Sequence, residues 1–193
     1  MKKCGIPLRL DDREAPWVER RLDDAGHTYT RTRMVAGDIA CVLPSGLSLG
    51  IERKTWQDLI GACRQRQQGG MRFLKQVQRL IAAYDIPVIL MEGGYRIYKT
   101  GHSDIGELDA HGTVLGGLSI AGGTKVAPGG LYLADAALMR AQHMGAWVTH
   151  CPEPELFGDR IHYLVSYIAK HSEEFTRSGR DAANPFDEDG SRG

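Results

Sequence analysis

The sequence predicts an α/β fold in which helices flank a mixed β-sheet. Two observations carry this prediction. Segments with strand-like apolar runs alternate with segments of helical periodicity over most of the chain. In addition, two early apolar runs, residues 39–43 and 47–51, are separated by the turn residues Pro44, Ser45 and Gly46. That arrangement is typical of a β-hairpin. A hairpin followed by helix–strand alternation places antiparallel and parallel neighbours in one sheet.

The remaining elements follow from local signals. Pro16 and Gly26 bound the first helix, and Thr55 is a suitable N-cap for the second. The uninterrupted apolar run at residues 87–91 indicates a buried central strand. We expect further strands at residues 7–11, 27–35 and 146–150, and helices at 17–24, 55–67, 71–84, 131–144 and 153–171.

The sequence predicts one well-buried domain at residues 1–174 and a disordered polar tail at 175–193. Within the domain, residues 93–130 hold eleven glycines in 38 residues, which is too long for a plain connection. A flexible insert with a short strand at 95–98 and a helical turn within 113–120 is expected there.

The formal net charge is zero, so the whole-chain charge does not indicate a nucleic-acid partner. Residues 52–79, however, carry seven basic side chains against two acidic ones, which favours a local phosphate-binding surface. The four cysteines are far apart and lack zinc-ligand spacing, so we expect no zinc. Cys41 and Cys63 fall at apolar positions of predicted elements, so we expect them to be buried free thiols. Neither a signal peptide nor a transmembrane run is apparent. These features predict a cytoplasmic protein in a reducing compartment, or one in the host cytoplasm if a phage encodes it.

The predicted hairpin carries the candidate catalytic residues. Because side chains alternate along a strand, Glu52 and Lys54 point to one face and Arg53 to the other. Pairing across the turn brings Asp38 close to Glu52. Two carboxylates suit Mg²⁺, and a lysine beside a metal-bound water can orient it. The alternative is an ordinary solvated face with a surface ion pair.

Longer sequence strings around these residues favour the catalytic site over the solvated face. The string ERKTWQD at residues 52–58, preceded by Gly37 and Asp38, resembles the ERKxxxD signature of the XPF-type (ERCC4 domain) structure-specific endonucleases. The string LDDRE at residues 10–14 resembles the family's VDxRE. Arg72 and Gln76 match an arginine and a glutamine of the family's second helix, after a short insertion near residues 64–70. Loops tolerate such insertions.

This resemblance implies a restriction-endonuclease-like core and a Mg²⁺-dependent DNA endonuclease, for which Mn²⁺ can substitute. Its substrate would be flapped, forked or branched DNA in repair or recombination. Asp38 and Glu52 would hold the metal, and Lys54 would position or activate the water. The supporting residues would be Asp11, Arg13, Glu14, Arg53 and Asp58. Asp58 can instead serve the helix that starts at Thr55, as an acid in its first turn. The DNA-binding residues would be Arg64, Arg66, Arg72, Lys75 and Gln76.

Two other functions stay open at this level. One is a catalytically weak or inactive DNA-binding or partner subunit of the same fold. The other is a Holliday-junction resolvase, because the tail is too short for the family's tandem helix-hairpin-helix domain.

The helix expected at residues 153–171 predicts a homodimer, because its apolar arc is wider than one contact requires. One stripe contains Phe157, Ile161, Leu164, Val165 and Ile168, and a second contains Leu156, Tyr163 and Tyr167. The second stripe is left for a partner unless the glycine-rich segment covers it. The resemblance also implies pairing through the final helices of the nuclease domain.

Overall fold

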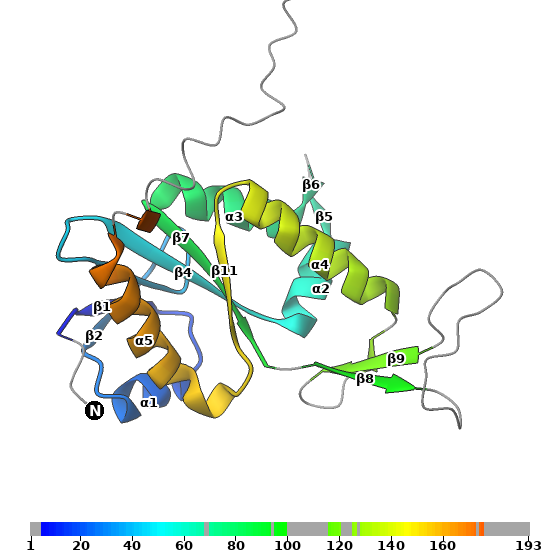
Figure 1. Ribbon diagram of the computed structural model, residues 1–193, viewed down its shortest axis with the longest axis horizontal. Coiled ribbons are helices and arrows are strands. Elements are labelled where there is room, and N and C mark those ends of the chain that lie inside the picture. Colours follow the sequence, from blue (N-terminus) through cyan, green and yellow to red (C-terminus); the bar gives the residue numbers. More distant parts are fainter. Residues whose placement is uncertain are drawn as a thin grey trace, which may run out of the picture.

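The computed structural model describes residues 5–67, 70–93, 95–99, 116–120, 125–126, 128–172 and 174–175. Its centre is a six-stranded mixed sheet with the order β11-β7-β4-β3-β1-β2 (Figure 1). The strands are β1 (Leu8–Asp11), β2 (Tyr29–Thr32), β3 (Ile39–Val42), β4 (Ser48–Thr55), β7 (Ile86–Glu92) and β11 (Trp147–Cys151). Strand β3 runs antiparallel to β1 and β4, whereas β1–β2, β4–β7 and β7–β11 are parallel. The predicted mixed sheet is therefore confirmed.

The predicted hairpin is formed by β3 and β4. Ile39 pairs with Ile51 in the register of the two strands, which sets Asp38 opposite Glu52. The connecting turn contains Gly46 at φ 85°, a left-handed conformation that glycine adopts without a Cβ penalty. Turn chemistry and strand pairing together fix which residues meet at the base of the hairpin.

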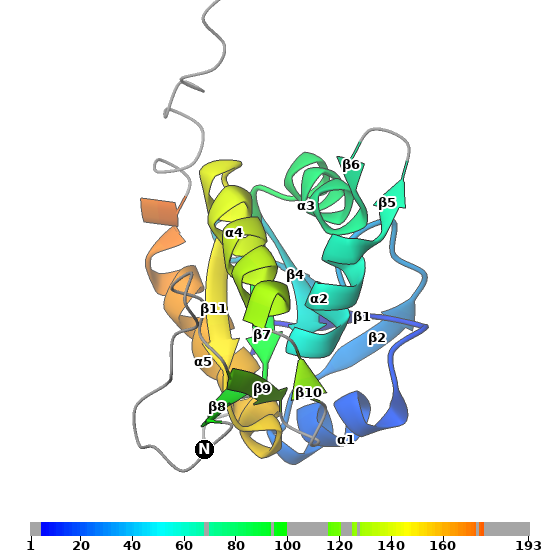
Figure 2. The same ribbon diagram turned by 90° about the vertical axis from the view of Figure 1, so that its right-hand side faces the viewer.

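Helices cover both faces of the sheet, as predicted (Figures 1 and 2). Helices α1 (Pro16–Asp24) and α5 (Phe157–Lys170) pack on one face, over a core that includes Leu49 and Ile51 of β4. Helices α2 (Trp56–Arg64), α3 (Arg72–Ala83) and α4 (Pro128–His143) pack on the other face, over Ile89 and Met91 of β7. Strand alternation thus divides the apolar residues between two separate cores.

Two glycines permit close packing between these layers. A Cβ atom at Gly50 would clash with the ring of Tyr84, which lies over β4 at that point. A Cβ atom at Gly158 would clash with the backbone carbonyl of Arg21, where α5 crosses α1. The first contact belongs to the face that also carries Glu52 and Lys54.

The structure corrects two local predictions. The helix expected at residues 55–67 ends at Arg64, and β5 (Arg66–Gln67) then pairs with β6 (Gly70–Met71). Residues 116–120, expected within a helical turn, form the strand β9 (Gly116–Ile120) between β8 (Tyr95–Lys99) and β10 (Lys125–Val126). In both places strand pairing outweighs local helical periodicity. The short strand expected at 95–98 is confirmed as β8.

The other expected elements are present with shifted ends. The last predicted helix begins as the short 3₁₀ helix η1 (Pro154–Leu156), which leads directly into α5. Cys41 and Cys63 are buried and form no disulfide, as predicted, and the same holds for Cys151. The disordered tail expected at 175–193, apart from Phe175, and most of the glycine-rich insert lie outside the described residues. Among the helices that the structure describes, none has the length and apolar character to cross a bilayer.

Candidate active site

The base of the β3–β4 hairpin brings Asp38, Glu52 and Lys54 together. The backbone N–H of Asp38 donates to the carbonyl of Ile51 at 2.8 Å, which extends the hairpin by one residue. The Asp38 carboxyl in turn accepts a hydrogen bond of 2.7 Å from the backbone N–H of Arg53. Lys54 Nζ lies 2.7 Å from Glu52 Oε1. The structure therefore places the three predicted site residues at one end of β4.

The Asp38 carboxyl is half-buried, and its surroundings shift its pKa. The pKa of Asp38 is raised to about 7, mainly by burial and in addition by the nearby carboxylates of Glu52 and Glu14. The Arg53 N–H and the Lys54 ammonium act in the opposite direction. Burial also raises the pKa of Glu14, which Arg53 and a hydrogen bond with Asp38 oppose. The Asp38 carboxyl thus lies within electrostatic range of two other carboxyl groups, and a cation beside it would offset their repulsion.

Arg53 anchors the opposite face of the same strand, as alternation predicts. Its guanidinium group binds the carboxylate of Glu92 in a bidentate manner, with Nη2 at 2.8 Å from Oε2, and it also binds Glu14. The same group lies 4.8 Å from the ring centroid of Trp17 and 5.2 Å from that of Phe157. Arg53 therefore ties β4 to β7 and α1 while its own N–H orients Asp38.

Glu92 is the participant that the sequence analysis missed. Its carboxylate is almost completely buried, at 3% exposure, at the carboxyl end of β7. In the sequence, an acidic residue directly after a strand-like apolar run indicates a buried carboxylate. Such a carboxylate needs a cationic partner. The sequence does not show which arginine meets it.

Asp11 and Arg13 form a separate pair at the edge of the site. The carboxylate of Asp11 accepts hydrogen bonds from the Arg13 N–H and guanidinium and from the Met34 N–H, at 2.7–3.0 Å. These bonds hold the pKa of the Asp11 carboxyl well below its ordinary range. Both oxygens are engaged, so Asp11 holds the loop that leads to Asp38, and it is not free to bind a metal ion.

Thr55 caps α2 in the structure, and Asp58 is its partner in the cap. The Asp58 backbone N–H donates to Thr55 Oγ1 at 3.1 Å, and the Thr55 hydroxyl donates to the Asp58 carboxylate at 2.8 Å. This is the capping arrangement that the sequence indicates. Among the described contacts, the Asp58 side chain meets Thr55, which agrees with the alternative of an acid in the first turn of the helix.

The predicted DNA-binding residues lie on α2, β5 and α3, in the layer that covers the Glu52 side of the sheet. Arg64 and Arg72 are exposed, and Arg72 Nη1 donates to Gln65 Oε1 at 2.8 Å. Lys75 is half-buried. The Oε1 atom of Gln76 is buried and has no hydrogen-bond partner among the described residues. The side chain of Arg66 lies outside the described part.

The comparisons with known proteins agree with this geometry. A family model described as the ERCC4 domain matches residues 10–114, more than half of the chain. The chain belongs to the ERCC4 domain family. The predicted resemblance is thereby confirmed, and the match includes each of the site residues named above.

Solved structures show the same fold. The XPF protein from Aeropyrum pernix in complex with DNA has 20% sequence identity and a TM-score of 0.54. That match covers 88% of this chain and 66% of the XPF chain. A second structure of XPF from Aeropyrum pernix gives 20% identity and a TM-score of 0.55, with coverage of 83% and 60%. This chain thus spans slightly less than two thirds of those proteins. Curated protein sequences gave no match.

The ERCC4 residues at the hairpin fit a hard divalent cation. Asp38 and Glu52 offer carboxylate oxygens, the donors that Mg²⁺ prefers, and Mg²⁺ commonly takes only one or two carboxylates besides water and phosphate. Within the described ranges, no three histidine, cysteine, aspartate or glutamate side chains form a ready metal cluster. A metal here would therefore be held by the carboxylate pair together with water and substrate oxygens.

Proposed function

We propose that the protein is a Mg²⁺-dependent DNA endonuclease, with Mn²⁺ as a substitute, that cuts flapped, forked or otherwise branched DNA in repair or recombination. The observation that carries the proposal is the meeting of Asp38, Glu52 and Lys54 at the end of β4 in an ERCC4 domain. The complex of the Aeropyrum pernix XPF with DNA supports DNA as the partner.

The residues of the site have separate tasks in this proposal. Asp38 and Glu52 hold the metal ion, and the Arg53 N–H fixes the direction of the Asp38 carboxylate. A bound Mg²⁺ supplies electrostatic stabilisation of the attacked phosphate and makes its bound water more acidic. The ion pair with Glu52 holds the Lys54 ammonium beside the carboxylate pair, where it would donate to the attacking water or to a phosphate oxygen.

The decisive experiment measures cleavage of labelled duplex, flap, fork and four-way-junction DNA with increasing Mg²⁺. We expect cleavage at the flap or fork, none in EDTA, and a loss of at least about 100-fold in rate for Glu52→Gln. DNA binding by Glu52→Gln should be retained. Glu155→Gln, which removes an exposed carboxylate on η1, serves as the matched control. Cleavage by Glu52→Gln at the wild-type rate would show that the catalytic carboxylate lies elsewhere.

The proposed enzyme acts as a homodimer through α5. Supporting this, Tyr163 and Tyr167 remain 56% and 42% exposed, and their rings stack 5.9 Å apart on the outer side of the helix. Their inner neighbours on α5 are buried in the core. An outward aromatic stripe is more typical of an interface than of a surface in contact with water.

A further inference from the structure

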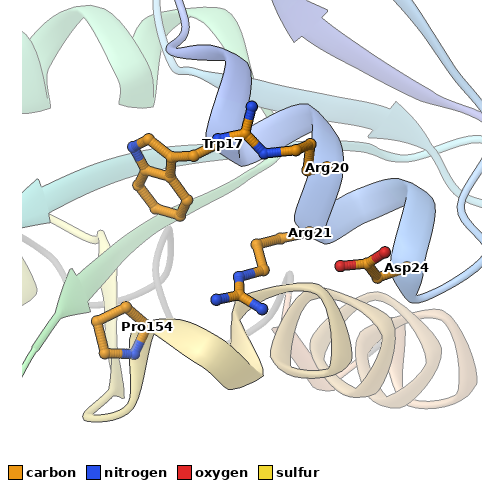
Figure 3. Close-up of a pocket in the computed structure, with 5 residues that line it drawn as sticks. All are labelled: Trp17, Arg20, Arg21, Asp24 and Pro154. Carbon is orange, nitrogen blue, oxygen red and sulfur yellow. The ribbon is translucent and has the colours of Figure 1, made fainter.

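A cavity of about 400 Å³ lies between α1 and the segment that enters α5. It is lined by Trp17, Arg20, Arg21, Asp24 and Pro154 (Figure 3). The volume falls within the range of roughly 300–1,000 Å³ that is usual for small-ligand sites. None of the tasks assigned to Asp38, Glu52 or Lys54 requires this cavity.

Two arginines give the cavity its charge. Arg20 is exposed and Arg21 is half-buried, and Arg21 extends from α1 toward the segment at Pro154. Neither side chain has a hydrogen bond or ion pair within the described part of the chain. By contrast, Arg13, Arg31, Arg33 and Arg53 each pair with a carboxylate. The two cavity arginines are therefore available for an anionic ligand.

The cavity also presents flat apolar surfaces. The ring of Trp17 and the ring of Pro154 line it from opposite elements, α1 and η1. The Arg53 guanidinium lies over Trp17 at 4.8 Å from the ring centroid, and Phe157 meets the indole edge-on at 5.7 Å. These contacts fix the indole in place, so that the part facing the cavity is a rigid surface for stacking.

An aromatic surface beside two unpaired arginines suits a nucleotide. A base can stack on Trp17, its phosphates can bind Arg20 and Arg21, and the Asp24 carboxylate can accept a hydrogen bond from a base amino group. Bases inside a duplex are stacked on one another and cannot enter such a cavity. The shape and charge therefore select an unstacked nucleotide.

We propose that this cavity binds an unstacked nucleotide in a single-stranded arm of the DNA substrate. The choice of DNA as the ligand rests on the proposed function, and the inference adds which part of a branched substrate is recognised away from the cleavage site. Trp17 touches Arg53, and Arg53 touches Glu14 and Asp38. The cavity is thus connected to the site through direct contacts.

The test measures binding in EDTA, where no metal-dependent cleavage occurs. Fluorescence anisotropy would compare a labelled oligo(dT), a blunt duplex, and the same duplex with a single-stranded overhang. The variant is Arg20→Ala with Arg21→Ala, and the matched control is Arg9→Ala with Arg140→Ala, which removes two exposed positive charges elsewhere. Trp17→Phe, which retains an aromatic ring on Phe157, tests stacking separately, and circular dichroism checks each fold.

We expect the Arg20/Arg21 variant to bind oligo(dT) and the overhang about tenfold more weakly than the control, with blunt-duplex binding equal in the two. Trp17→Phe should weaken oligo(dT) binding in the same direction. Equal overhang binding by variant and control would overturn the inference, and so would an equal loss on blunt duplex. Saturable binding of thymidine monophosphate, with unchanged oligo(dT) binding in the variant, would assign the cavity to a free nucleotide instead and also overturn it.

Cleavage in Mg²⁺, measured separately, distinguishes the two proposals. A wild-type protein that fails to cut DNA but binds the overhang through Arg20 and Arg21 contradicts the nuclease and leaves the cavity assignment standing. A wild-type protein that cuts DNA, with overhang binding unaffected by both cavity variants, contradicts the cavity assignment alone.

Discussion

At the residue scale, Arg53 joins the two faces of the sheet. Its backbone N–H holds Asp38 in the candidate site, while its side chain is held between Glu92, Glu14 and the ring of Trp17. Because Arg53 is held rigidly between Glu52 and Lys54, it fixes the position of the β4 segment that carries both residues. The residue is thus a positioning group, since its side chain points away from the carboxylates that would bind metal.

Replacing Arg53 by methionine should therefore destabilise the whole domain. The change leaves Glu92 buried without a cation, and removal of one partner of a buried pair costs about 3–5 kcal/mol. Urea denaturation would measure the free energy of unfolding. Arg33→Ala breaks the exposed pair with Asp12 and should cost at most about 1 kcal/mol. Equal losses for the two variants would contradict the anchoring role.

The raised pKa of Asp38 predicts how stability depends on pH. Its folded pKa of about 7 exceeds the ordinary 3.8, so the native state binds more protons than the unfolded state. The corresponding stability is fully present below about pH 3.8 and is lost as pH rises to about 7. Each unit of elevation is equivalent to about 1.4 kcal/mol.

Asp38→Asn removes this titration. Without metal, we expect the variant to gain stability relative to the wild type as pH rises from about 4 to about 7. Thermal unfolding of both proteins across that pH range would measure the difference. Added Mg²⁺ should stabilise the wild type at pH 7 and leave the variant nearly unchanged, because binding to the native state stabilises it. Parallel pH profiles of the two proteins would argue against a crowded carboxyl group at this position.

Local rules are sufficient to predict that Asp38, Glu52 and Lys54 lie close together, because hairpin pairing and strand alternation operate within a few residues. They are insufficient for Glu92. Its partner Arg53 is 39 positions away, and the two meet only through the parallel pairing of β4 with β7. The sequence specifies a buried acid but not the strand that will lie beside it.

At the scale of elements, boundaries set by local residues are predicted correctly, whereas boundaries set by distant strand partners are not. The helix that starts after Thr55 has a local cap and was correctly placed at that end. Its other end was wrong, because the pairing of Arg66 with Met71 ends the helical path and depends on residues beyond it. The strand β9 was missed for a similar reason, since its partner β8 lies well upstream.

The contact between Gly50 and Tyr84 gives a matched pair of predictions. Gly50→Ala places a methyl group against a ring whose hydroxyl donates to the Ala36 carbonyl at 2.9 Å, so Tyr84 cannot withdraw easily. We expect a loss of about 1–3 kcal/mol in the free energy of unfolding. Gly61→Ala, in α2 with open space around it, should instead gain about 0.5–1 kcal/mol. Denaturant midpoints would show whether the two changes have opposite signs.

The basic surface of α2, β5 and α3 is tested by salt dependence. If Arg64, Arg66, Arg72 and Lys75 contact phosphates, each alanine substitution should reduce the slope of log affinity against log salt by about one unit. Affinity would be measured on one duplex at several salt concentrations, with Arg140→Ala as the control. A quadruple variant with the wild-type slope would place the DNA on another surface.

At the scale of the whole molecule, the two cores leave α5 incompletely covered. The stripe of α5 that contains Phe157, Ile161 and Ile168 is buried against α1 and the sheet, as predicted. The second stripe, with Leu156, Tyr163 and Tyr167, remains exposed by 42–56%. The ring centroid of Phe175 lies 6.0 Å from that of Tyr167, the last residue of this stripe. A stable interface buries roughly 1,200–2,000 Å² in total, so a dimer through α5 needs more surface than this stripe alone.

The resulting prediction is that the wild type is a dimer and that Tyr163→Glu with Tyr167→Glu yields a folded monomer. Two carboxylates facing their copies across an apolar interface would be desolvated and would repel each other. Light scattering at micromolar concentration gives the mass, and circular dichroism checks the fold. Tyr132→Glu, on the outer side of α4 at 61% exposure, should leave the dimer intact. A monomeric wild type would contradict the prediction. The stripe would then be a surface that the protein's own chain covers, and pairing would not contribute to the binding of branched DNA.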